Sequence, residues 1–220
     1  MTFIDIHRHT PPAQELGHTI ISLNLNHLQG EKPGHFPFTA GLHPWWIKEI
    51  DTHQALLRLQ ELSQLPNYLC MGEIGLDRAI ETDFNLQREV FTSQVELAKR
   101  LSPRAIVIHC VRAFNEIISV INKTQYAGKL IFHDYNAGED ITLDLIKRGH
   151  YFSFGRHLFN EKTKAFKVFK SIPLSQIFLE TDDWSEVEMA NVYQRAAELR
   201  SIEVSQLELQ IERTFQHIFN

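Results

Sequence analysis

Eight short apolar runs separated by helix-like stretches restrict the fold more than any other feature of this sequence. They are rich in Ile, Val, Phe and Leu, as strands buried on both faces are. The runs are Phe3–His7, Thr19–Leu25, Pro37–Leu42, Tyr68–Ile74, Ala105–His109, Lys129–His133, Tyr151–Phe154 and Gln176–Thr181. Strands that alternate with helices pair in parallel, and eight of them favour an α/β fold of the (β/α)8 TIM-like barrel type.

Helical periodicity fills most of the intervals between these runs. Apolar residues recur at three- and four-residue spacing in His53–Leu65 and in Asn85–Leu101, and a proline follows each segment. The other expected helices are Arg112–Lys123, Asp140–Lys147, Glu161–Lys170, Glu188–Leu199 and Val204–Phe219. Since about 250 residues is typical of such a barrel, the 220 residues predict a trimmed one. With no repeat or linker in sight, we expect a single domain over residues 1–220.

Composition excludes several classes of protein. The formal net charge of −5 gives no global basic footprint for nucleic acid or membrane, and no run of about 18 apolar residues exists. Cys70 and Cys110 lie in apolar runs, which predicts buried thiols in a reducing compartment. We therefore expect a cytoplasmic protein without membrane contact, and nothing in the sequence indicates an obligate protein partner. Twelve histidines against two cysteines favour a nitrogen and oxygen metal site.

Ionisable residues stand where the apolar runs end. His7 and His9 are one residue apart, so their side chains share one face at the end of a strand. The residues at the ends of other runs are His43, Glu73, His109, His133 and Asp182. In a barrel these ends meet at one mouth. The alternative to a binding site is that these histidines are hydrogen-bonded structural residues and that the aspartate caps a helix.

The number of these side chains predicts a particular kind of metal centre. They exceed what one tetrahedral ion takes, and they suit two ions about 3.5–4 Å apart bridged by a carboxylate. Glu73 is the natural bridge, because it is the acid among the endpoints of the middle strands. Histidine and carboxylate sets accept Zn, Mg, Mn or Fe, so the pattern predicts two divalent ions without naming the metal.

The order of these motifs resembles the TatD-type metal-dependent deoxyribonucleases of the amidohydrolase superfamily. The segments that carry the resemblance are His7-Arg-His9, Gly41-Leu-His43-Pro44, Gly72-Glu-Ile-Gly-Leu-Asp77, Ile108-His109-Cys110, Phe132-His133 and Glu180-Thr-Asp182. The helical pattern Gln87-x3-Phe91-x2-Gln94-x2-Leu97-Ala98 is similar to the family as well. The resemblance extends from Ile4 to about Phe219.

The resemblance implies a role for each of these residues. One ion would be held by His7, His9, Glu73 and Asp182. The second ion would be held by Glu73, His109 and His133. Asp182 would also orient or deprotonate the attacking water, so that Asp182 and Glu73 are the expected catalytic residues. His43 would face the substrate phosphate.

Three departures from the family lie in the loops that hold substrate. The family's arginine after the fourth motif stands one place later here, at Arg112. The loop His133-Asp-Tyr-Asn-Ala-Gly138 is one residue longer than the family's, and the R-N-x-P loop after Asp182 is missing. The metal set is thus intact, whereas the substrate loops differ.

Further residues near the strand ends are candidates for binding substrate. Arg112 and Arg156 are expected to clamp phosphate, with ion pairs to acidic neighbours as the alternative. Trp45-Trp46 is expected to form an apolar lid, with base stacking as the alternative. Asp5 and Glu180 are expected to accept imidazole N–H groups. The histidines expected at the surface are His18, His27, His35, His53, His150, His157 and His217.

The sequence therefore favours a divalent-metal-dependent hydrolase that cleaves phosphodiester bonds in DNA, or in another phosphate-bearing substrate, through metal-activated water. Amide or ester hydrolysis is the alternative chemistry for the same residues. A metal-stabilised barrel that binds without catalysis is a third reading. The presence of Asp182 disfavours this third reading, since binding alone needs no water-activating carboxylate.

Overall fold

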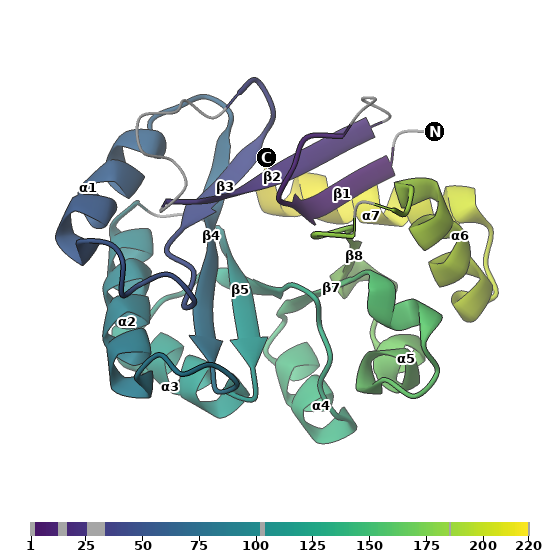
Figure 1. Ribbon diagram of the computed structural model, residues 1–220. Coiled ribbons are helices and arrows are strands. Elements are labelled where there is room, and N and C mark those ends of the chain that lie inside the picture. Colours follow the sequence, from purple (N-terminus) through teal and green to yellow (C-terminus); the bar gives the residue numbers. More distant parts are fainter. Residues whose placement is uncertain (1–2, 13–16, 26–33, 102–103, 185, 220) are drawn as a thin grey trace. The chain divides into compact units, whose positions relative to one another are not determined.

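The computed structural model describes residues 3–12, 17–25, 34–101, 104–184 and 186–219. Its strands form one sheet in chain order (Figure 1). They are β1 (Phe3–Arg8), β2 (Gly17–Asn24), β3 (Phe38–Gly41), β4 (Tyr68–Asp77), β5 (Ala105–Val111), β6 (Lys129–Phe132), β7 (Tyr151–Phe154) and β8 (Ile177–Leu179). Strands pair in parallel, as β4 does with β5 and β7 with β8. Arg8 also forms a parallel bridge to Asp182, just after β8. This is the strand order of a (β/α)8 barrel.

Helices occupy the connections where periodicity predicted them. They are α1 (Thr52–Leu62), α2 (Phe84–Leu101), α3 (Phe114–Thr124), α4 (Glu139–Lys147), α5 (Lys164–Val168), α6 (Met189–Arg200) and α7 (Val204–Phe219). Three short 3₁₀ turns accompany them, η1 (Arg156–Phe159), η2 (Phe169–Ser171) and η3 (Leu174–Gln176). The helix expected over Glu161–Lys170 starts later, because the Thr163 hydroxyl caps α5 by accepting the N–H of Phe166.

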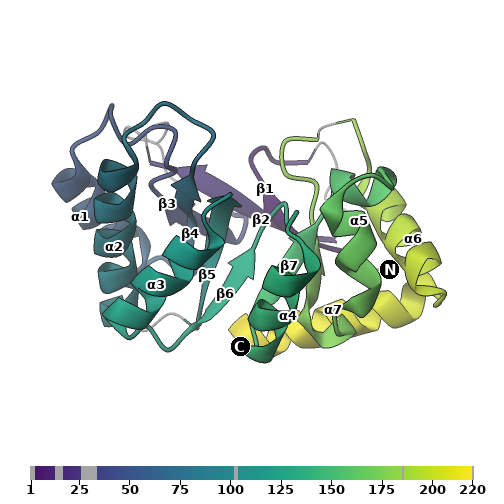
Figure 2. The ribbon, with the colours of Figure 1, turned by 90° about the horizontal axis from the view of Figure 1, so that it is seen from below.

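The chain divides into two compact units. The first comprises residues 1–21 and 131–220, and the second comprises residues 22–130. In the first unit, α6 and α7 pack against β1, and α7 also lies against β8 (Figures 1 and 2). The Tyr193 hydroxyl of α6 accepts the N–H of Ile4 at 3.1 Å and donates to its carbonyl at 3.2 Å. Helix α6 is thereby fixed to the strand that carries the two N-terminal histidines.

The second unit packs α1 on β3, α2 on β4 and α3 on β5 (Figure 2). Two buried glutamines of α2 hold the ends of β3 and β4. Gln94 accepts the N–H of Leu42 at 2.7 Å and donates to its carbonyl at 3.1 Å. Gln87 does the same for Asp77, at 2.8 and 2.9 Å. These bonds satisfy backbone groups at the points where the strands leave the sheet.

The expected surface histidines are mostly where the sequence placed them. His18, His35, His53 and His217 are exposed, and His157 is half-buried. His27 lies outside the described residues. The prediction for His150 is wrong: its side chain is buried, with its ring 6.2 Å from that of Phe132.

Within the described ranges, no helix has both the length and the apolar composition that crossing a membrane requires.

Cys70 makes stability depend on pH in the alkaline range. The thiol is fully buried on β4, and burial raises its pKa from the ordinary 9.0 to about 12. Between these values the folded chain keeps a proton that the unfolded chain loses, so stability falls as pH rises through this window. From about pH 8 to about pH 10 we expect the wild type to lose about 1.4 kcal/mol more unfolding free energy than Cys70→Ala. Urea titrations at each pH measure this difference, and equal pH slopes would contradict it.

Gly75 permits the close pairing of β4 with β5. It faces His109 in register with φ +158°, and a Cβ there would lie 1.8 Å from the His109 carbonyl oxygen. We expect Gly75→Ala to lower the unfolding free energy by at least about 2 kcal/mol, because a backbone carbonyl must move. Gly138→Ala is the control: its Cβ would meet nothing within 4 Å. A change of similar size in both variants would show that this contact is unimportant.

Candidate metal centre

The first unit brings together three predicted ligands. His7 and His9 stand at the end of β1, and Asp182 follows β8. The Asp182 Oδ1 atom lies 3.2 Å from His9 Nε2 and 3.7 Å from His7 Nε2. Ligand atoms of all three residues lie within 4.8 Å of one another. The N–H of Asp182 donates to the His7 carbonyl at 2.9 Å, which holds the loop after β8 beside β1.

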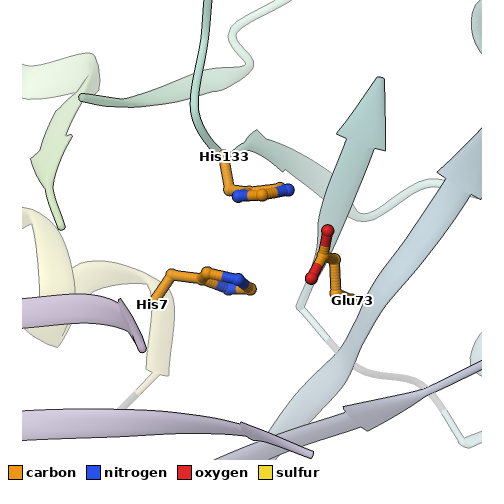
Figure 3. A group of neighbouring side chains, drawn as sticks. All are labelled: His7, Glu73 and His133. Carbon is orange, nitrogen blue, oxygen red and sulfur yellow. The ribbon is translucent and has the colours of Figure 1, made fainter. Parts of the chain in front are cut away.

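His133, directly after β6, belongs to the same cluster. Its ring stacks on that of His7, with centroids 4.3 Å apart and planes inclined by 29° (Figure 3). Both histidines are buried. Figure 3 also labels Glu73, which belongs to the second unit and is described with it below.

Two more buried acids, Glu180 and Asp5, form hydrogen bonds beside this cluster. Glu180 Oε1 accepts the N–H of Asp134 at 2.5 Å and lies 3.8 Å from His133 Nδ1. Burial raises the pKa of Glu180 well above its ordinary value. Asp5 accepts the N–H and the hydroxyl of Thr181, at 3.0 and 2.5 Å. Burial raises the pKa of Asp5 to about 6, although these hydrogen bonds lower it. Asp5 therefore braces the loop that carries Asp182.

The two carboxylate oxygens of Asp182 contact different partners, and Arg156 binds one of them. Its Nη2 atom donates to Asp182 Oδ2 at 2.9 Å and to Asp183 Oδ1 at 2.7 Å, and its Nε atom lies 4.0 Å from Asp134. Oδ1 of Asp182 faces the histidines, as described above. The alternative expected for Arg156, ion pairing with acidic neighbours, is thus realised, while 43% of its side chain stays exposed.

The second unit holds a cluster around Glu73 of β4. The Glu73 Oε1 atom lies 3.0 Å from His43 Nε2 and 2.8 Å from His109 Nδ1. All three side chains are buried, and their ligand atoms lie within 4.8 Å of one another. His43 was expected to face substrate, so its place beside Glu73 adds a possible third ligand to this group.

Asp77, which was not among the predicted site residues, completes this cluster. Its Oδ2 atom lies 3.2 Å from His109 Nε2 and accepts the indole N–H of Trp45 at 2.7 Å. Burial alone would raise the pKa of Asp77, but the hydrogen bonds from His109, Trp45 and Ala79 outweigh it and lower the pKa to about 2. The signal for Asp77 in the sequence is its place as the last residue of the Gly72–Asp77 motif.

Arg112 and Arg78 differ in their availability to substrate. Within the part of the chain that the structure describes, no side chain pairs with Arg112, which is exposed and has φ +55°. Arg78, by contrast, forms an ion pair with Glu116 and stacks on the Phe84 ring at 3.9 Å from its centroid. Of the two, Arg112 is the one whose guanidinium makes no ion pair with a described side chain.

The donor atoms of both clusters fit a divalent metal. Each cluster presents imidazole nitrogens and a carboxylate, the ligand types of Zn, Mn and Fe sites. Glu180 lies 3.8 Å from His133, and Asp77 lies 3.2 Å from His109, as carboxylates that orient metal-binding histidines do. Each unit thus offers at least three ligand atoms of its own.

The fold matches solved structures of other proteins. The TatD homologue YJJV from Escherichia coli K12 superimposes with a TM-score of 0.82 at 19% sequence identity, covering 99% of this chain and 98% of that one. A TatD-family hydrolase from Entamoeba histolytica gives a TM-score of 0.80 at 13% identity, covering 100% and 98%. These likenesses confirm the predicted (β/α)8 fold class.

Sequence comparisons point to the same family. The uncharacterized metal-dependent hydrolase YabD of Bacillus subtilis is 30% identical over 64% of this chain and 56% of its own length. The putative deoxyribonuclease TATDN3 of Mus musculus is 34% identical over 52% of this chain and 40% of its own. The chain thus spans about half the length of these curated relatives. The family model described as TatD related DNase matches residues 18–220, so the chain belongs to the TatD-related family of metal-dependent hydrolases.

Proposed function

We propose that this chain is a divalent-metal-dependent phosphodiesterase that cleaves DNA. The observation that carries the proposal is the contact of Asp182 with His7 and His9 after β8. Relatives named for such an activity support it. They include the putative deoxyribonuclease from mouse and the 3'-5' ssDNA/RNA exonuclease TatD of Enterobacter lignolyticus, which is 26% identical over 66% of this chain and 56% of its own length.

We propose further that the two clusters form one centre and that residues 1–220 act as one domain. One ion would then be bound by His7, His9, Glu73 and Asp182. The other ion would be bound by Glu73, His109 and His133. His43 is close enough to Glu73 to join this second set. Free thiols at Cys70 and Cys110 support a cytoplasmic location.

The residues of the chain divide the reaction among them. Divalent ions at the centre would supply polarisation of a phosphoryl oxygen and would acidify water. Asp182 accepts the proton of the attacking water. Arg156 keeps the Asp182 carboxylate in a fixed orientation through its Oδ2 atom. His43 and Arg112 hold the substrate phosphate, and Arg156 contributes to it through its exposed part.

Asp182→Asn tests the chemistry. The amide keeps the shape of the side chain but removes the charge and the basic oxygen, so we expect kcat on a labelled single-stranded oligodeoxynucleotide to fall by about 10²–10⁴. Rates are measured with Mg²⁺, Mn²⁺ and Zn²⁺ in turn. Asp144→Asn is the matched control, since Asp144 of α4 forms an exposed ion pair with Arg148, the residue that follows this helix. Undiminished turnover in Asp182→Asn, or wild-type cleavage of carboxylic esters but not of the oligonucleotide, would refute the proposal.

Glu73→Gln tests the bridging role. If Glu73 belongs to both ion sites, its loss weakens both, whereas a ligand of one site weakens that site alone. We expect the affinity for both ions to fall at least about 100-fold, more than loss of an outer hydrogen-bond partner costs. Isothermal titration with Mn²⁺ and Zn²⁺ gives affinity and stoichiometry. Glu61→Gln, on the exposed face of α1, is the control. Two ions bound normally by Glu73→Gln would exclude the bridge.

A further inference from the structure

Trp45 combines exposure with a fixed orientation. About half of the accessible surface of this residue, 51%, is exposed. Its indole N–H nevertheless donates to the buried Asp77 at 2.7 Å, and its backbone N–H donates to His43 Nδ1 at 3.2 Å. An apolar lid, the role expected from the sequence, would bury the ring against apolar neighbours. Trp45 instead presents an aromatic surface to solvent while a polar anchor holds its inner edge.

The indole borders the candidate metal centre of its own unit. Its ring centroid lies 5.0 Å from that of His43 and 6.0 Å from that of His109, in both cases edge to face. The two histidine rings are themselves 4.3 Å apart. The rings of His43 and His109 therefore lie between the carboxylate of Glu73 and the exposed indole of Trp45. A nucleotide whose phosphate is bound at these two histidines would have its base within reach of the indole.

We propose that Trp45 is a platform on which a nucleobase of the substrate stacks, which makes this residue a determinant of specificity for single-stranded, base-bearing phosphodiesters. The inference rests on the proposed function. Aromatic side chains bind bases of any identity through their faces, and this is the usual mode for single strands. Bases inside a duplex are already stacked on both sides, so duplex DNA would gain less. The hydrogen bond to Asp77 pre-orients the ring, so little freedom is lost on binding.

A competing role must be separated from stacking. Trp45 also donates to Asp77, which in turn contacts His109. Loss of the indole could therefore disturb the metal centre without any direct contact to substrate. A positioning effect of that kind slows every substrate equally. Stacking affects only substrates that have a base to stack.

The experiment compares two oligonucleotides of equal length. One is single-stranded oligothymidylate, and the other carries tetrahydrofuran sugars without bases on the same phosphodiester backbone. We expect the wild type to prefer the base-bearing strand in kcat/KM by roughly 5- to 150-fold, the range that stacking on one aromatic side chain covers. In Trp45→Ala this ratio should fall toward one, chiefly through KM. Trp45→Phe should keep most of the ratio, because it retains a ring and loses only the N–H.

Leu57→Ala is the matched control, because Leu57 of α1 is exposed to a similar degree, 47%. It should leave the preference for the base-bearing strand unchanged. If Trp45→Ala keeps the wild-type ratio, or slows both strands by the same factor, the platform is refuted. Absence of turnover by the wild type with every metal would instead refute the proposed function. In that case, fluorescence anisotropy with both labelled strands tests the stacking role of Trp45 alone. Tighter binding of the base-bearing strand by the wild type, lost in Trp45→Ala, would support this role. Equal binding of both strands by the wild type would overturn it.

Discussion

The side chains at the strand ends depend on one constraint, which is that buried carboxylates must pair with imidazoles. Removing a carboxylate from water costs several kcal/mol unless a charged or hydrogen-bonding partner compensates for it. In the second unit Glu73 and Asp77 share the rings of His43 and His109. Carboxylate oxygens beside imidazole nitrogens are also a donor set that divalent cations accept, which is why the same residues suit a metal centre.

The strands could be predicted from the sequence because a buried parallel strand is apolar on both faces. Their ends could not be placed as well, since tertiary contacts decide them. β4 runs on to Asp77 because Gln87 of α2 satisfies both backbone groups of that residue. β8 ends at Leu179, and the next residues are held by side chains, as when Asp5 binds Thr181. Neither contact follows from local periodicity.

The candidate site was predictable where its residues follow the repeat of a strand or end an apolar run. His7 and His9 could be recognised in that way, and the structure places Asp182 beside them. The contacts of Asp77 could not be inferred, because its partners come from β5 and from the loop after β3. His150 was misjudged for a related reason: a histidine directly before a strand reads as surface, whereas here it packs on an aromatic ring.

The departures from the family motif alter the charges in the loop after β8. Where the family has its R-N-x-P loop, this chain has Asp183, and Arg156 binds both Asp183 and Asp182. A guanidinium already shared by two carboxylates attracts a phosphate less strongly than a free one, since the opposite charges largely cancel at these distances. Arg112 pairs with no described side chain and is exposed, so it is the stronger candidate of the two for the phosphate of the proposed function. Under the proposed function, attraction of a phosphate would depend chiefly on Arg112, and the proposed stacking on Trp45 would gain in importance for holding the rest of the nucleotide.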